Sequence, residues 1–103
     1  MDKIFGLIGL AKRAGKISGG EFSVTASIKD KTAQLVIIAA DASDNTKKKI
    51  IDSCRFYNVD YIEYGSLEEL GKFTGSGIRA VISVKDSGFK NAIKKHFENN
   101  SGF

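Results

Sequence analysis

Apolar residues at helical spacing predict the first element of the chain. Ile4, Leu7, Ile8 and Ala11 recur every three or four positions, as on the buried face of a helix, and Gly15 follows as a stop signal. Residues 16–18 are predicted to be a short extended piece that leads into two glycines. A second, weakly amphipathic helix is then expected, and the residues that share one of its faces are Glu21, Val24, Thr25 and Ile28.

The middle of the chain predicts a strand followed by a crossover helix. "QLVIIAA", residues 34–40, is a largely apolar run of strand length, which is typical of a strand covered on both faces. Ser43 and Asp44 are N-cap candidates for the next helix. The residues on the inward side of that helix are Ile50, Ile51, Cys54 and Tyr57.

The same alternation continues to the end. "VDYIEY", residues 59–64, predicts a second strand, and Ser66 and Glu69 have capping-box spacing before a short helix. "IRAVISV", residues 78–84, predicts a third strand. Asp86 can cap a last helix whose inward residues are Phe89, Ala92, Ile93 and Phe97.

This alternation predicts an α/β fold. We expect a single-domain three-layer α/β/α sandwich with a small central mixed sheet. The domain is expected to span residues 1–98, and residues 99–103 to form a frayed C-terminal tail.

Composition supports one folded domain with an anionic partner. The chain has 103 residues, of which 42% are hydrophobic and 27% charged, enough for one modest core. Its net charge of +4 favours a phosphate-bearing partner. The N-terminal apolar run is brief and carries Asp2 and Lys3, and no stretch is long enough to cross a membrane. We therefore expect a cytoplasmic protein with no membrane contact.

The residues offer no clear acid–base chemistry. His96, the only histidine, has no second base or nucleophile at a recognisable spacing, so a helix-border role is favoured. Cys54, the only cysteine, lies on an inward helix face and excludes an intrachain disulfide. Asp41 follows the buried strand, where a functional carboxylate or a simple helix start are both expected. No cofactor or metal is predicted.

Two glycine-rich loops are candidates for a binding surface. "SGGE" at 18–21 and "TGSG" at 74–77 allow close backbone approach to a phosphate or a base edge, although turn geometry alone also explains them. Neither matches a P-loop or a dinucleotide fingerprint. The cations in or near these segments are Lys12, Arg13, Lys16, Lys47, Lys48, Lys49 and Arg79. They form either a phosphate-tracking surface or a solvated charged face.

Four segments together resemble a known family. "LIGLAKRAGKISGGE", "LVIIAADASDNTKKKI", "SLEELGKFTG" and "RAVISVKDSGF" are similar to the kink-turn RNA-binding ribosomal protein superfamily of archaeal and eukaryotic large subunits, and most of all to its small bacterial YlxQ-type branch. The resemblance covers nearly the whole chain. It implies a binder of kinked RNA in which a short helix enters a widened groove at sheared G·A pairs and an apolar loop supports an extruded nucleotide.

The family's reader motif is glycine, a variable residue, asparagine, glutamate and, three positions later, lysine. Placed without gaps, it falls on Gly20, Glu21, Phe22, Ser23 and Ala26, and only the glycine matches. Phe22 cannot make the hydrogen bonds of an asparagine. It could stack on a base or pack against the neighbouring loop, and packing is the interpretation we favour.

The second loop follows the family pattern better. The resemblance places Gly77, Ile78 and Arg79 in the apolar RNA-supporting loop, with Ile78 on the splayed nucleotide and Arg79 on the backbone. Asp41 and Ser43 would flank the same surface. The remaining implied contacts are backbone amides from Gly19 to Glu21, and phosphate neutralisation by Lys16, Lys47 and Arg79.

The sequence therefore predicts a non-enzymatic, monomeric RNA-binding protein that recognises kink-turn-like or other structured RNA, in association with the ribosome. The alternative is a family fold that has lost specific kink-turn readout and serves as a protein-interaction or nonspecific RNA-binding module. A small enzyme or nucleotide binder that uses the glycine loops is the third hypothesis.

Overall fold

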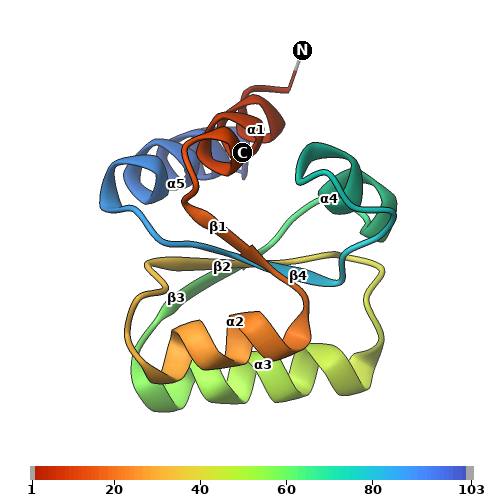
Figure 1. The fold of residues 1–103 in the computed structure, drawn as a ribbon, viewed down its shortest axis with the longest axis vertical. Coiled ribbons are helices and arrows are strands. Elements are labelled where there is room, and N and C mark those ends of the chain that lie inside the picture. The colour runs from red at the N-terminus through yellow and green to blue at the C-terminus, as the bar shows by residue number, and fades with distance from the viewer. Residues whose placement is uncertain (1, 102–103) are drawn as a thin grey trace.

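The computed structural model describes residues 2–101, and these form five helices and four strands (Figure 1). In chain order the elements are α1 (Lys3–Arg13), β1 (Ile17–Gly19), α2 (Glu21–Lys29), β2 (Leu35–Ile38), α3 (Asp44–Tyr57), β3 (Asp60–Glu63), α4 (Leu67–Phe73), β4 (Val81–Val84) and α5 (Ser87–Ser101).

Side-chain caps explain where several helices begin. The Ser43 hydroxyl accepts a hydrogen bond from the Thr46 amide, and Ser66 and Glu69 form a complete capping box at the start of α4. The Asp86 carboxylate accepts from the Phe89 amide at 2.9 Å. These three predicted caps are confirmed, and each typically stabilises its helix by about 1 kcal/mol.

The four strands form one mixed sheet in the order β1-β4-β2-β3. β2 and β3 are parallel, whereas β4 runs antiparallel to both β1 and β2. All residues of β2 and β4 are buried, because helices cover both faces of these two central strands. The apolar runs that predicted them are therefore buried from both sides.

Helices form a layer on each side of the sheet (Figure 1). α2 and α3 pack together on one face, and α1 packs with α4 and α5 on the other. The Ser27 and Ser83 hydroxyl oxygens, both buried, lie 3.0 Å apart and join α2 to β4. The predicted three-layer α/β/α sandwich with a mixed sheet is confirmed.

Several boundaries differ from expectation. β4 begins at Val81, so residues 78–80 of the predicted third strand belong to the preceding loop. The extended piece at residues 16–18 is a true edge strand, β1, which pairs with β4 through the register Ile17–Val84 and Gly19–Ile82. α5 continues to Ser101, so the helix extends into the segment expected to be the C-terminal tail, while residues 102 and 103 lie outside the described part. Among residues 2–101, the helices are too short or too polar to cross a membrane.

Candidate functional site

The two glycine-rich loops meet at one end of the sheet. β1 and β2 finish at this end and β4 begins there, because β4 is antiparallel to both. The Gly20 amide donates to the Val81 carbonyl at 3.1 Å, and the Ala39 amide donates to the Ala80 carbonyl at 2.8 Å. The start of α2 and the loop before β4 are therefore neighbours (Figure 1).

Gly20 forms the N-cap of α2 with φ +91° and ψ 154°. This backbone conformation is one that residues with a β-carbon rarely adopt. Gly20 has no side chain to cap the helix, so the first-turn amides of α2 are not satisfied by an N-cap side chain. These amides, together with the helix dipole, favour an anion at this position.

The side chain of Arg79 lies against the two glycines. A β-carbon on Gly19 would come within 2.8 Å of Arg79 Nε, and one on Gly20 within 2.9 Å of an Arg79 terminal nitrogen. Arg79 Nε is buried and has no hydrogen-bond partner among the described residues. We call Gly19, Gly20 and Arg79 the glycine–arginine cluster. It fixes one cation at the start of α2.

Two large apolar side chains of the predicted site are exposed. Phe22, in the first turn of α2, is 88% exposed, so the prediction that it packs against the neighbouring loop is wrong. A shallow hollow of about 380 Å³ lies beside it and is lined by Glu21, Phe22, Thr25 and Lys49. Lys49 forms a 2.9 Å ion pair with Glu21 across this hollow. Ser23 is also exposed.

The loop before β4 holds Ile78 outward, 62% exposed. A β-carbon on Gly71 would lie 2.5 Å from the Gly77 carbonyl oxygen, so α4 packs directly against this loop. The Ser76 amide donates to the Gly71 carbonyl at 2.8 Å, and the buried Thr74 hydroxyl donates to the Leu70 carbonyl at 2.7 Å. Sequence reasoning missed Gly71 as a support of the loop, because only its contact with Gly77 reveals that role.

Three predicted site residues make contacts within the protein. Asp41 accepts a hydrogen bond from the Leu67 amide at 2.8 Å and so helps α4 begin. Ser43 caps α3. Lys47 Nζ donates to the Ala40 carbonyl at 2.7 Å and lies 3.1 Å from the Glu63 carboxylate, with its side chain 22% exposed. Its charge is thus already paired within the protein, which weighs against the expected contact with phosphate.

Lys16 lies apart from the other predicted residues. It precedes β1, where its carbonyl accepts from the Lys85 amide just after β4, whereas Gly20 follows the opposite end of β1. The structure therefore groups the start of α2 with the loop at residues 77–79. It places Lys16 at the other end of the sheet.

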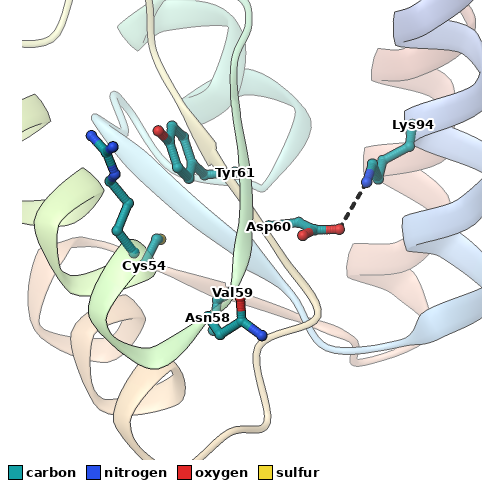
Figure 2. A pocket seen from close by; sticks show the side chains of 7 residues that line it. Cys54, Asn58, Val59, Asp60, Tyr61 and Lys94 are labelled. Carbon is teal, nitrogen blue, oxygen red and sulfur yellow. Dashed lines mark hydrogen bonds and ion pairs between the residues drawn. The ribbon is translucent and has the colours of Figure 1, made fainter.

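A second hollow, of about 420 Å³, lies at the amino end of β3 (Figure 2). The Asp60 carboxylate is 2.8 Å from Lys94 Nζ and 3.3 Å from Lys90 Nζ, and the hydrogen bond from Lys94 is the main cause that lowers its pKa. Cys54 also lines this hollow but is inaccessible to solvent, and burial raises the pKa of its thiol to about 11. A protonated, buried thiol is a poor nucleophile.

The three residues considered for catalysis do not share a pocket. His96, half-buried on α5, lines a groove with residues of α1, and neither Asp41 nor Cys54 lines that groove. No group of three or more histidine, cysteine or acidic side chains within the described chain could hold a metal ion. The glycine–arginine cluster, with Phe22 and Ile78, is therefore the candidate site that we carry forward.

Comparisons with known proteins identify relatives along nearly the whole chain. Residues 2–94 match the model of the ribosomal protein L7Ae/L30e/S12e/Gadd45 family. The RNA-binding protein YlxQ of Bacillus subtilis (strain 168) is 43% identical over 89 residues, which cover 86% of this chain and 89% of that protein. The RNA-binding protein YlxQ of Enterococcus faecium is 41% identical over 97 residues, with coverages of 94% and 93%.

Solved structures share the fold. A protein with unknown function from Bacillus halodurans C is similar with a TM-score of 0.91 at 35% identity, covering 95% of this chain and 99% of that one. The Giardia lamblia 15.5kD RNA binding protein has a TM-score of 0.77 at 22% identity, with coverages of 93% and 86%, a likeness of fold alone. On the family match and the two bacterial relatives, the chain belongs to the ribosomal protein L7Ae/L30e/S12e/Gadd45 family.

Proposed function

We propose that this protein binds structured RNA through the start of α2 and the loop before β4, and that the preferred RNA is kinked, with an extruded nucleotide, as in kink-turns of ribosomal RNA. The observation that carries the proposal is the position of Arg79 against Gly19 and Gly20, beside first-turn amides that lack an N-cap side chain. Two bacterial relatives with more than 40% identity are named RNA-binding proteins, which supports the same class of ligand.

Each part of this surface suits one part of an RNA. The first-turn amides of α2 and the planar guanidinium of Arg79 suit phosphate oxygens, which accept several hydrogen bonds at once. The exposed Phe22 ring offers a stacking surface for an unpaired base. Ile78, held outward by the packing of α4 against its loop, offers an apolar support for a second unstacked base.

The test compares two RNAs. The purified protein is titrated, near physiological salt, with a duplex that contains a kink-turn and with the same duplex in which Watson–Crick pairs replace the sheared G·A pairs. A preference of tenfold or more corresponds to about 1.4 kcal/mol of discrimination and supports the proposal. The affinity should also fall steeply with salt, since phosphate contacts release counterions.

A second candidate function is favoured by one observation. Phe22, Ser23 and Ala26 stand at the positions where the family resemblance expects asparagine, glutamate and lysine, so direct reading of guanine edges is weakened. The surface could then bind RNA without specificity or dock a protein. Equal, salt-sensitive affinity for the two duplexes indicates nonspecific RNA binding. A partner that stays bound in a pull-down after nuclease treatment indicates protein docking.

A further inference from the structure

A groove of about 460 Å³ runs between α1 and α5, in the helix layer on the opposite face of the sheet from α2 (Figure 1). Its lining residues are Lys3, Gly6, Leu7, Leu10, Arg13 and His96. Leu10, in the C-terminal half of α1, is 50% exposed there. The five α1 residues recur at helical spacing, so they form one continuous face of that helix.

Gly6 keeps this groove open without serving the packing of its own chain. A β-carbon on Gly6 or on Gly9 would meet nothing within 4 Å, and both residues lie inside α1. Glycine inside a helix is less stable than alanine. The fold therefore does not require glycine at either position, and at Gly6 the missing side chain leaves room at the surface for another molecule.

The groove has positive charge near both ends of its apolar floor. Lys3 and Arg13 are separated by ten residues, about 15 Å along a helix. Neither has an ion-pair partner among the acidic side chains of residues 2–101. His96 adds a hydrogen-bonding ring from α5. The complementary ligand is apolar along its centre and carries carboxylates at both ends.

The charge pattern of the groove favours a protein partner over a second copy of this chain and over RNA. A second copy of the chain, packed with its α1 antiparallel to the first, would set Lys3 opposite Arg13, and like charges facing each other oppose association. RNA would satisfy the cations but would leave the apolar floor around Leu7 and Leu10 against charged phosphates. An acidic amphipathic helix satisfies both features.

We propose that the α1–α5 groove docks an acidic amphipathic helix of a partner protein. Apolar side chains of the incoming helix, at positions i, i+3 or i+4, and i+7, would cover Leu7 and Leu10, and its glutamates would pair with Lys3 and Arg13. The groove lies between α1 and α5, whereas the glycine–arginine cluster lies at the end of the sheet where β1 leads into α2. The protein could therefore hold RNA and a protein partner at once, but the docking proposal does not depend on RNA binding.

The experiment uses defined peptides as probes. A helical peptide of about five turns, with leucines on one face and glutamates at its flanks, is titrated into the full-length ¹⁵N-labelled protein, and amide chemical shifts are followed. The control peptide keeps the leucines and replaces every glutamate by lysine. We expect shifts confined to α1 and α5, affinity for the acidic peptide at least tenfold higher than for the control, and loss of binding in Leu10→Glu.

Gly6→Ala and Gly9→Ala form a matched pair of variants. Both should raise the melting temperature by a few degrees, because each replaces glycine by alanine inside a helix where nothing lies within contact distance. Only Gly6 lines the groove, so only Gly6→Ala should weaken peptide binding, by threefold or more. A merely structural role for Gly6 would move the melting temperature and leave the peptide affinity unchanged.

Several results would overturn the proposal. The first is an absence of chemical-shift changes on α1 and α5 at millimolar acidic peptide, and the second is equal affinity for the two peptides. The third is an equal change of peptide affinity in Gly6→Ala and Gly9→Ala. Shifts on α1 and α5 that grow with protein concentration alone would assign the groove to a second copy. Shifts there on addition of RNA without peptide would assign it to nucleic acid.

Discussion

Arg79 lies against Gly19 so closely that a β-carbon on the glycine would approach Arg79 Nε to 2.8 Å. Gly19 ends β1 and Arg79 lies in the loop before β4, and the antiparallel pairing of β1 with β4 brings the two residues together. The two glycines of the first loop therefore leave room for the side chain of Arg79 as well as for a ligand. Any side chain at position 19 must move the guanidinium, and this relationship yields the first prediction.

Gly19→Ala should weaken RNA binding with little loss of stability. The atoms that clash belong to the flexible end of Arg79, so the guanidinium can move aside at small cost to folding but leaves its place at the start of α2. We expect urea unfolding to change by less than about 1 kcal/mol. Arg79→Ala should lower the slope of log affinity against log salt by about one, as for one lost phosphate contact.

The double variant Gly19→Ala/Arg79→Ala is the control for this pair. In the Arg79→Ala background the glycine substitution should have little further effect on RNA affinity, because the group that it displaces is already gone. Additive losses of affinity in the double variant would show that Gly19 contacts RNA by itself and would contradict the role we assign to Arg79.

Phe22 and Phe56 offer a matched test of stacking. Both rings are highly exposed, 88% and 80%, but Phe22 lies in the first turn of α2 and Phe56 lies near the end of α3, away from the glycine–arginine cluster. Phe22→Ala should cost about 1 to 3 kcal/mol of RNA-binding free energy, the usual contribution of a ring stacked on a base. Phe56→Ala should leave the affinity unchanged. Fluorescence anisotropy with a labelled RNA measures both, and equal losses would rule out stacking on Phe22.

Lys47 should contribute to folding and not to RNA affinity. Its ammonium group bonds the Ala40 carbonyl and Glu63, so Lys47→Met should lower the free energy of unfolding by about 1 kcal/mol. Lys48, whose ion pair with Asp52 is exposed, is the control, and Lys48→Met should change stability by less than about 0.5 kcal/mol. Urea unfolding tests stability, and RNA titration across salt concentrations should give the wild-type slope for Lys47→Met. A reduced slope would mean that Lys47 does reach a phosphate.

Asp60 should make the free energy of unfolding depend on pH in the acidic range. Its pKa is lowered from 3.8, mainly by the hydrogen bond from Lys94, so the folded state holds the carboxylate charged more strongly than the unfolded state does. This contribution to stability is complete well above pH 3.8 and is lost as the pH falls below 3.8 toward the lowered pKa. Asp60→Asn should flatten the pH dependence of unfolding in this window. An unchanged profile in the variant would assign the acid sensitivity to another carboxylate.

The layered fold follows from the sequence because its signals are local. The buried runs of β2 and β4, and the caps at Ser43, Ser66 and Asp86, each depend on a few neighbouring residues. β1 carried no comparable signal, since it has three residues and ends in glycine. Its strand character comes from pairing with β4, which lies far along the chain.

The site was harder to predict because its contacts join distant segments. Lys47, Lys48 and Lys49 are alike in sequence, and only the fold brings Glu63 to the first of them and Glu21 to the third. The exposure of Phe22 can be predicted from helical periodicity. Phe22 lies two positions before Val24, or 200° around a helix, so burial of Val24 places Phe22 on the outward side.

Because β1 pairs with β4 in the sheet, the candidate site contains residues from both ends of the chain. β1 is translated early and sits at the sheet edge, where the strand beside it is β4, near the end of the chain. Gly19 and Arg79 are 60 positions apart, so a chain interrupted before residue 79 has the glycines but neither the arginine nor the strand β4 that pairs with β1. Such a fragment lacks the part of the proposed binding surface that the loop before β4 supplies. If RNA binds at this surface as proposed, binding requires the completed fold, and unfinished chains do not compete with the finished protein for its ligand.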